Sequence, residues 1–141
     1  MTNIDKDACR DAYNEVRDDN SDTNWAVFQY EGSRIVPTMK GTEFKEFSKL
    51  CVEDGRLFGY MRFMTGDAMS KRTKFTLITW IGEGVGGLQR AKISTDKTLV
   101  KEIVQNFAKE FMLSEQRDLD EDSIRMELMK AGGANYDAQA E

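Results

Sequence analysis

Two strongly apolar stretches limit the folds that are open to this chain. Residues 57–64 read LFGYMRFM, and residues 75–81 read FTLITWI. Both stretches place hydrophobic side chains at odd and at even positions, and a strand with that pattern is buried on both of its faces. They therefore predict two central strands of a β-sheet that has helices packed on each side.

The segment between these stretches, GDAMSKRTKF at residues 66–75, is basic. It carries Lys71, Arg72 and Lys74 in a chain of 141 residues whose formal net charge is −5. The segment is longer than a tight hairpin turn. We therefore expect an exposed strand connection whose local positive charge faces a partner.

Hydrophobic periodicity and turn residues predict the other elements of the chain. The predicted helices cover residues 5–19, a short segment from Thr42 to near Gly55, 96–111 and 118–130. The other predicted strands cover 25–30 and 34–39 around a turn at 31–33, and a short stretch that starts at 112–113. This order predicts one layered α/β (α+β) domain at residues 1–133, with a central mixed β-sheet flanked by helices on both faces, and a flexible C-terminal tail at 134–141.

Three residues predict local details of these elements. Asp5 and Thr42 are placed to cap the N-termini of the first and second helices with their side-chain oxygens. Pro37 has no backbone N–H and cannot donate to a sheet ladder. The strand that contains Pro37 is therefore expected at a sheet edge or with a bulge at that point.

The absence of histidine excludes several kinds of enzyme. Nucleophiles activated by histidine and metal sites built from histidine are both impossible without it. Carboxylates are plentiful, but they are scattered over the predicted helix surfaces, and no spacing marks a coupled pair. We therefore expect no catalytic site, no cofactor and no metal.

Charge and hydropathy exclude further classes of protein. An acidic net charge argues against a general nucleic-acid binder. No stretch is long enough for a membrane span, and the N-terminal segment is too polar for a signal peptide. Cys9 and Cys51 lack a paired or metal-type spacing. We therefore expect reduced thiols, a cytoplasmic location, and neither a nucleic acid nor a membrane as partner.

The glycine-rich segment GEGVGG at residues 82–87 matches the dinucleotide-binding pattern G-x-G-x-x-G. It also lies between a predicted strand and a predicted helix, as that pattern requires. However, Glu83 would lie beside the pyrophosphate, and Glu102 falls inside a helix where it cannot bind a ribose. Because no clear second parallel strand follows, we favour a strand-to-helix turn over a dinucleotide site.

Basic residues also gather on the long helix. If this helix is continuous from about residue 88, then Arg90, Lys97 and Lys101 fall within an arc of about 40°. The apolar positions of the helix face away from them. The helix is therefore expected to turn one face to the core and a basic ridge to solvent.

The acidic residues gather elsewhere, at residues 5–22 and 115–127. This separation of charge predicts an acidic macromolecular partner that is recognised through the electrostatic field. On the long helix, Lys92 lies four residues before Asp96 and is expected to pair with it. Such local pairing weakens the ridge, so the strand connection is expected to dominate binding.

Six short stretches resemble one known family. They read GDAMSKRTKF, LITWIGE, GLQRAK, TDKTLVKE, QNFAKEF and AGGANYDAQ, in this order along the chain. Together they closely resemble coactosin-like proteins, which belong to the actin-depolymerising-factor homology (ADF-H) family of cofilin and twinfilin. The resemblance extends over essentially the whole chain with matching spacing.

The resemblance implies an ADF-H domain and a non-enzymatic protein that binds filamentous actin (F-actin). It further implies poor binding of actin monomers, no clear severing activity, and a role in regulating the actin cytoskeleton of the cytoplasm. A leukotriene-producing enzyme, 5-lipoxygenase, is implied as a second partner. We expect the chain itself to be a monomer.

The resemblance also assigns residues to these partners. Lys74 matches the filament-binding lysine of the SKR-KF pattern, and Lys130 matches a lysine implicated in lipoxygenase binding. The other implied actin-binding positions are Lys71, Arg72, Arg90, Lys97 and Lys101. Cofilins carry an N-terminal serine whose phosphorylation turns off actin binding. This chain starts Met-Thr-Asn-Ile, so the resemblance does not imply that control at Thr2.

Three hypotheses of function remain at this point. The chain is a filament-actin binder, a dinucleotide-dependent enzyme that uses residues 82–87, or a scaffold whose main partner is the lipoxygenase. Co-pelleting with actin filaments separates the first from the other two, and nicotinamide fluorescence tests the second.

Overall fold

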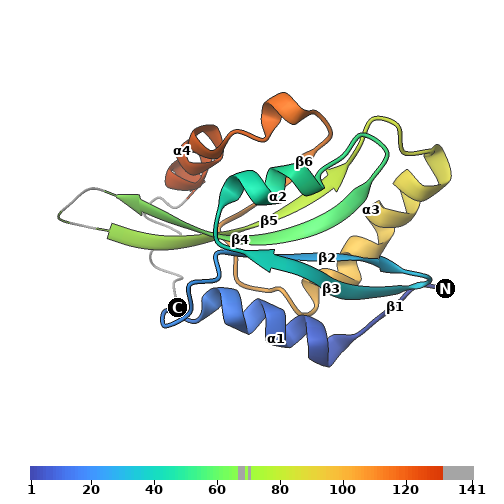
Figure 1. Cartoon of the computed structure of the whole chain (residues 1–141), viewed down its shortest axis with the longest axis horizontal. Coiled ribbons are helices and arrows are strands. Elements are labelled where there is room, and N and C mark those ends of the chain that lie inside the picture. Colours follow the sequence, from blue (N-terminus) through green and yellow to red (C-terminus); the bar gives the residue numbers. More distant parts are fainter. Residues whose placement is uncertain (67–68, 70, 132–141) are drawn as a thin grey trace.

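The computed structural model describes residues 1–66, 69 and 71–131. In this part of the chain a six-stranded mixed sheet forms the centre, with strand order β1-β3-β2-β4-β5-β6 (Figure 1). The strands are β1 (Asn3–Ile4), β2 (Trp25–Glu31), β3 (Arg34–Gly41), β4 (Arg56–Gly66), β5 (Lys71–Ile81) and β6 (Lys109–Leu113). β1 pairs parallel with β3 and β6 parallel with β5, whereas the other pairs are antiparallel. The predicted interior position of the two apolar strands, β4 and β5, is confirmed.

The helices cover both faces of this sheet (Figure 1). They are α1 (Lys6–Arg17), α2 (Phe44–Leu50), α3 (Gly87–Lys101) and α4 (Glu121–Ala131), with a 3₁₀ turn, η1 (Gln116–Asp118), before the last. Buried residues of α1 and α3 share one core cluster, and buried residues of α2 and α4 share the other. The predicted layered α/β architecture is therefore confirmed.

Side chains alternate between the two core clusters along each central strand. On β4, Phe58 and Tyr60 face the α1–α3 side, while Leu57 and Met61 face the α2–α4 side. Such strands bury side chains on both faces, which is why their sequences are hydrophobic at odd and even positions.

Two predicted local details are confirmed. The backbone N–H of Ala8 donates to the Asp5 carboxylate at 3.1 Å, which caps α1. Pro37 lies opposite Phe28 in the β2–β3 register, and a register shift follows at this point. β1 covers the outer edge of β3 only at its first two residues, so the proline lies on an open edge beside a bulge.

The predicted cap of the second helix is wrong. Glu43 occupies the N-cap position of α2, and no side chain donates or accepts a capping hydrogen bond there. The backbone carbonyl of Thr42 instead accepts a hydrogen bond from the Asn24 side chain at 2.9 Å. Thr42 thereby belongs to the loop that joins β3 to α2, and the helix starts one residue later than predicted.

The predicted bounds of the long helix are also wrong. α3 is continuous from Gly87, which the predicted basic ridge of Arg90, Lys97 and Lys101 assumed. However, the helix ends at Lys101 instead of extending to 111. Ile103 and Val104 are buried although they lie beyond the end of the helix. Their apolar spacing therefore resembles a helix that the backbone does not form there. The chain leaves the helix because β6 pairs with β5 from Lys109 onward, and sheet hydrogen bonds take over there.

The last helix begins at Glu121 instead of 118. The predicted domain end at residue 133 and the predicted tail at 134–141 lie outside the described residues. Within the described residues, every helix is too short or too polar to cross a lipid bilayer.

Candidate functional site

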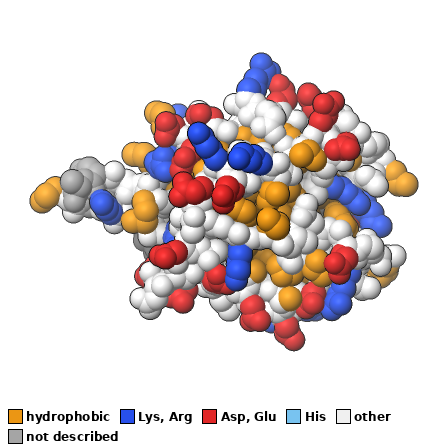
Figure 2. Space-filling view, in the orientation of Figure 1, with side chains coloured by type: hydrophobic (Ala, Val, Ile, Leu, Met, Phe, Trp, Pro, Cys, Tyr) orange, Lys and Arg blue, Asp and Glu red, His pale blue; other side chains and the backbone are white. Residues whose placement is uncertain are grey.

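The basic segment predicted as a connection is largely part of a strand. β4 and β5 continue as a long two-stranded hairpin, in which Gly66 lies opposite Lys71 and Thr65 opposite Arg72. This hairpin stands out from the body of the molecule and carries basic and hydrophobic side chains (Figures 1 and 2). The basic residues therefore sit on a strand-paired arm instead of a loop.

The three basic residues of the arm differ in exposure. Lys71 and Arg72 are exposed, whereas the Lys74 side chain is only 3% exposed. Lys74 lies opposite Phe63 in the ladder, at the same strand parity as Ile78 and Trp80, which face the α2–α4 side. The expectation that Lys74 is an exposed loop lysine is wrong, because strand alternation turns its side chain toward the helix-covered face.

Arg125 joins α4 to the base of this hairpin. Its Nε donates to the Met64 carbonyl at 3.1 Å, and its guanidinium lies 5.4 Å from the centre of the Phe63 ring. The same guanidinium pairs with Asp122 at 3.1 Å and Glu121 at 3.3 Å. Sequence inspection missed Arg125, because nothing in a single helix indicates which strand it will contact.

The basic ridge of α3 is only partly as predicted. Lys97 and Lys101 do lie on one side of the helix, but both pair with Glu110 of β6. Their Nζ atoms lie 3.3 Å and 2.8 Å from the two carboxylate oxygens of Glu110. Sequence inspection also missed Glu110, which is nine residues from Lys101 and on a different element.

Arg90 does not belong to the ridge. Its guanidinium donates to the Gly82 carbonyl at 3.1 Å and to the Val85 carbonyl at 3.3 Å. These bonds turn the side chain back toward the loop that precedes α3. Arg90 therefore holds the start of the helix in place, and the expectation that it contributes a solvent-facing charge is wrong.

The glycine-rich loop is bonded to its own protein. The N–H groups of Gly82 and Gly84 donate to the carbonyls of Gly55 and Glu53 at 2.9 Å and 2.8 Å. A Cβ at position 82 would collide with the backbone carbonyls of Val52 and Glu53. Although β6 does follow α3 as a parallel strand, these two amides are not free for a phosphate, and Gly82 serves close packing.

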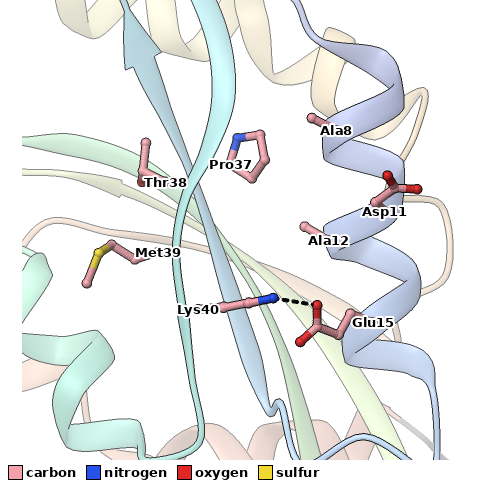
Figure 3. Close-up of a pocket in the computed structure, with 8 residues that line it drawn as sticks. All are labelled: Ala8, Asp11, Ala12, Glu15, Pro37, Thr38, Met39 and Lys40. Atoms are coloured by element: carbon pink, nitrogen blue, oxygen red, sulfur yellow. Dashed lines mark hydrogen bonds and ion pairs between the residues drawn. The ribbon is translucent and has the colours of Figure 1, made fainter.

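A groove of about 370 Å³ lies between α1 and the open edge of β3 (Figure 3). Ala8 and Ala12 line its helix side, and Pro37 lines its strand side. The Lys40 ammonium and the Glu15 carboxylate pair across one end at 2.7 Å. The Asp11 carboxylate also lines the groove, but it and the Lys40–Glu15 pair do not form a convergent polar set of the kind that holds a ligand.

A family model described as cofilin/tropomyosin-type actin-binding protein matches residues 1–129. The chain belongs to this actin-binding family. Within it, the chain is 65% identical to the coactosin-like protein of Bos taurus over 140 residues, which is 99% of each chain.

Solved structures support the same placement. The crystal structure of human coactosin-like protein has 62% sequence identity and a TM-score of 0.90, and covers 92% of this chain and 99% of its own. The solution structure of mouse coactosin, described as an actin filament binding protein, has 64% identity and a TM-score of 0.79, and covers 99% of both chains. The resemblance to coactosin-like proteins of the ADF-H family is thereby confirmed.

Lys130, the position implied in lipoxygenase binding, lies in the last turn of α4. Its Nζ lies 3.7 Å from Glu127, and Lys109 of β6 pairs with the same carboxylate at 3.0 Å. Glu127 therefore holds one lysine of β6 and one of α4, much as Glu110 of β6 holds two lysines of α3.

The predicted pairing of Lys92 with Asp96 is wrong. Asp96 is buried and accepts hydrogen bonds from the Tyr30 hydroxyl at 2.6 Å and the Thr2 hydroxyl at 2.8 Å. Asp96 therefore ties the N-terminal segment and β2 to α3. Within the described residues no cluster of acidic residues and cysteines has the arrangement of a metal site.

Proposed function

We propose that the chain binds actin filaments through the basic arm of the β4–β5 hairpin. The observation that carries this proposal is the exposure of Lys71 and Arg72 on a projecting, strand-paired hairpin of a domain of an actin-binding family. Lys74 contributes from the covered face of the same arm, and Lys97 and Lys101 of α3 assist. In an acidic protein, a local basic surface orients the molecule toward an acidic partner.

The proposal includes a specific mode of action. The chain acts on the actin cytoskeleton in the cytoplasm as a monomer, binds actin monomers poorly and does not sever filaments. A projecting arm suits contact with a long assembled surface. The internally paired lysines of α3 offer less charge to a single actin subunit.

Co-sedimentation with actin filaments at two salt concentrations tests this proposal. Binding is expected at low salt and is expected to weaken as the Debye length falls from about 10 Å at 0.1 M to about 3 Å at 1 M. The absence of the chain from the pellet at low salt would contradict filament binding. Salt-independent pelleting would contradict the electrostatic part of the proposal and would favour an apolar interface.

Parallel measurements address monomers and severing. Gel filtration with monomeric actin is expected to show no stable complex. Filament lengths measured by fluorescence microscopy are expected to stay unchanged when the chain is added. Shortened filaments or a comigrating actin complex would contradict the proposed mode of action.

A second proposed partner is 5-lipoxygenase, bound through Lys130. The Lys130 side chain is 70% exposed, and its ion pair with Glu127 is long at 3.7 Å, so its charge is accessible. Affinity capture of purified 5-lipoxygenase by the wild-type chain and by Lys130→Ala tests this. Equal capture by both proteins would remove Lys130 from the interface, and no capture by either would remove the partner.

A further inference from the structure

Glu110 holds two lysines of the proposed actin-binding surface. Lys97 and Lys101 lie one turn apart on α3, and their ammonium groups lie on opposite oxygens of the Glu110 carboxylate. The three side chains are 23%, 41% and 29% exposed, respectively, so the cluster is at the surface but partly covered. Lys101 also lies 5.8 Å from the centre of the Phe107 ring.

The charges of this cluster favour a closed arrangement. Two lysines at positions i and i+4 repel each other, and the carboxylate between them relieves that repulsion. Partial burial opposes ionisation of Glu110, but hydrogen bonds from Lys101 and Lys97 outweigh it and hold its pKa below the ordinary value. Glu110 is therefore ionised at neutral pH and cancels one of the two positive charges.

We propose that Glu110 sets the affinity of the α3 surface for actin filaments by competing with the filament's carboxylates for Lys97 and Lys101. The inference rests on the proposed function and names a residue that regulates it. To contact these lysines, a carboxylate of the partner displaces Glu110 or shares a lysine with it. Glu110 thereby weakens binding although it does not touch the partner.

Glu127 provides a matched control for this competition. It also lies between two lysines, Lys109 and Lys130, but on the α4 side of the molecule. Replacement of either glutamate by glutamine changes the net charge of the chain by the same amount. Any difference between the two variants therefore reports location and not total charge.

Glu110→Gln is expected to bind actin filaments about two- to fivefold more tightly than wild type at low salt, the range set by one surface ion pair. The affinity of Glu110→Gln should fall more steeply with added salt than that of wild type. In the variant the two lysine charges are both available to the filament, whereas in wild type Glu110 cancels one of them. Glu127→Gln is expected to bind as wild type does. An unchanged or lowered affinity of a folded Glu110→Gln protein would overturn the proposal.

The same substitution in a chain without the two lysines separates competition from direct repulsion. In a Lys97→Ala/Lys101→Ala background, Glu110→Gln is expected to have no effect on filament affinity. A gain that persists in this background would show that Glu110 repels the filament directly, and the proposed competition would be wrong.

A measurement without actin distinguishes failure of this inference from failure of the proposed function. Lysine acetylation by an excess of a water-soluble N-hydroxysuccinimide ester, read by mass spectrometry, reports how freely each ammonium group is released. Lys97 and Lys101 are expected to react about two- to fivefold faster in Glu110→Gln than in wild type. Equal rates would overturn the inference whether or not the chain binds filaments. Faster acetylation without filament binding by wild type would overturn both the proposed function and the competition with filaments.

Discussion

Lys74 of β5 lies directly opposite Phe63 of β4, and both side chains are almost completely buried. Phe63 belongs to the core cluster on the α2–α4 side. The aliphatic stem of a lysine in this position packs among the hydrophobic side chains at the base of the hairpin. A substitution at Lys74 therefore changes packing as well as charge.

Two variants separate these effects. Lys74→Ala is expected to weaken filament binding and to lower the free energy of unfolding by about 1–3 kcal/mol, the usual range for truncating a buried side chain. Lys74→Met keeps most of the stem and is expected to lose binding with a smaller loss of stability. Urea unfolding and co-sedimentation measure the two properties. If Lys74→Met pelleted with filaments as wild type does, the charge of Lys74 would have no role in binding.

The exposed hairpin charges are expected to matter more than the α3 lysines. Lys71→Glu should reduce filament affinity more than Lys101→Glu, because Lys101 already shares Glu110 with Lys97. The double reversal should be worse than either single change. Co-sedimentation isotherms at one low salt concentration measure all three. A larger loss for Lys101→Glu would make α3 the primary contact and would contradict the proposed weak binding of monomers.

Gly82 tests the packing role of the glycine-rich loop. Gly82→Ala is expected to destabilise the fold by more than about 2 kcal/mol, because the new Cβ meets the backbone carbonyls of Val52 and Glu53, which cannot move independently. Gly87→Ala is the control, since it has open space in the first turn of α3 and should be neutral or stabilising. Thermal unfolding measures both. A stable Gly82→Ala protein would show that the loop tolerates a side chain, and the close-packing explanation would be wrong.

Arg62 is expected to be a main support of the loop before β2. Its guanidinium donates to the carbonyls of Asp18, Ser21 and Thr23 at 2.7–3.0 Å, and its Nε donates to the Asn24 side chain at 3.2 Å. Arg62→Ala should lower the free energy of unfolding by about 2–3 kcal/mol, since bonds to charged groups are the stronger ones.

Arg10 provides the comparison for Arg62. Among the described residues, it makes only an exposed ion pair with Asp7 at 3.6 Å, so Arg10→Ala should change stability by less than about 0.5 kcal/mol. Urea unfolding of the two variants side by side is the measurement. Equal stability of the two variants would contradict the proposal that Arg62 stabilises the loop before β2.

Buried thiols are expected to make the fold sensitive to alkaline pH. Burial raises the pKa of Cys51 from 9.0 to about 12, and burial, with a smaller contribution from Asp5, raises that of Cys9 to a similar value. The folded state keeps these protons when the unfolded chain releases them. Their contribution to stability is therefore complete below about pH 9 and is lost progressively as the pH rises toward 12.

The loss is expected to reach about 1.4 kcal/mol per thiol at pH 10, one unit above the unfolded pKa. Cys51→Ala removes one of these protons, so its stability should fall less steeply than that of wild type between pH 8.5 and 10. Urea unfolding across this range measures the slope, which is independent of the constant cost of the cavity. Parallel slopes for the two proteins would contradict the assignment to Cys51.

Local sequence patterns were sufficient for the elements that depend on neighbouring residues. Stretches that are apolar at odd and even positions identified the central strands, and Asp5 identified the start of α1, because both signals act within a few residues. The end of α3 was missed because apolar residues continue at helical spacing through Ile103 and Val104, whereas the helical backbone ends at Lys101. Competition between helix and sheet hydrogen bonds decided that boundary, and the competing strand, β5, lies more than 20 residues earlier in the chain.

The sequence by itself determined the layered fold, the central strands and the membership of an actin-binding family, since these follow from patterns spread over the whole chain. Only the tertiary structure decided what each basic side chain faces. Strand pairing placed Lys74 on the covered face of the arm, and the return of the chain to β6 placed Glu110 between Lys97 and Lys101. The turn of the loop before α3 brought the Gly82 and Val85 carbonyls to Arg90. Charge can be counted along a chain, but the direction and the partner of a charge are set by register and packing between distant elements.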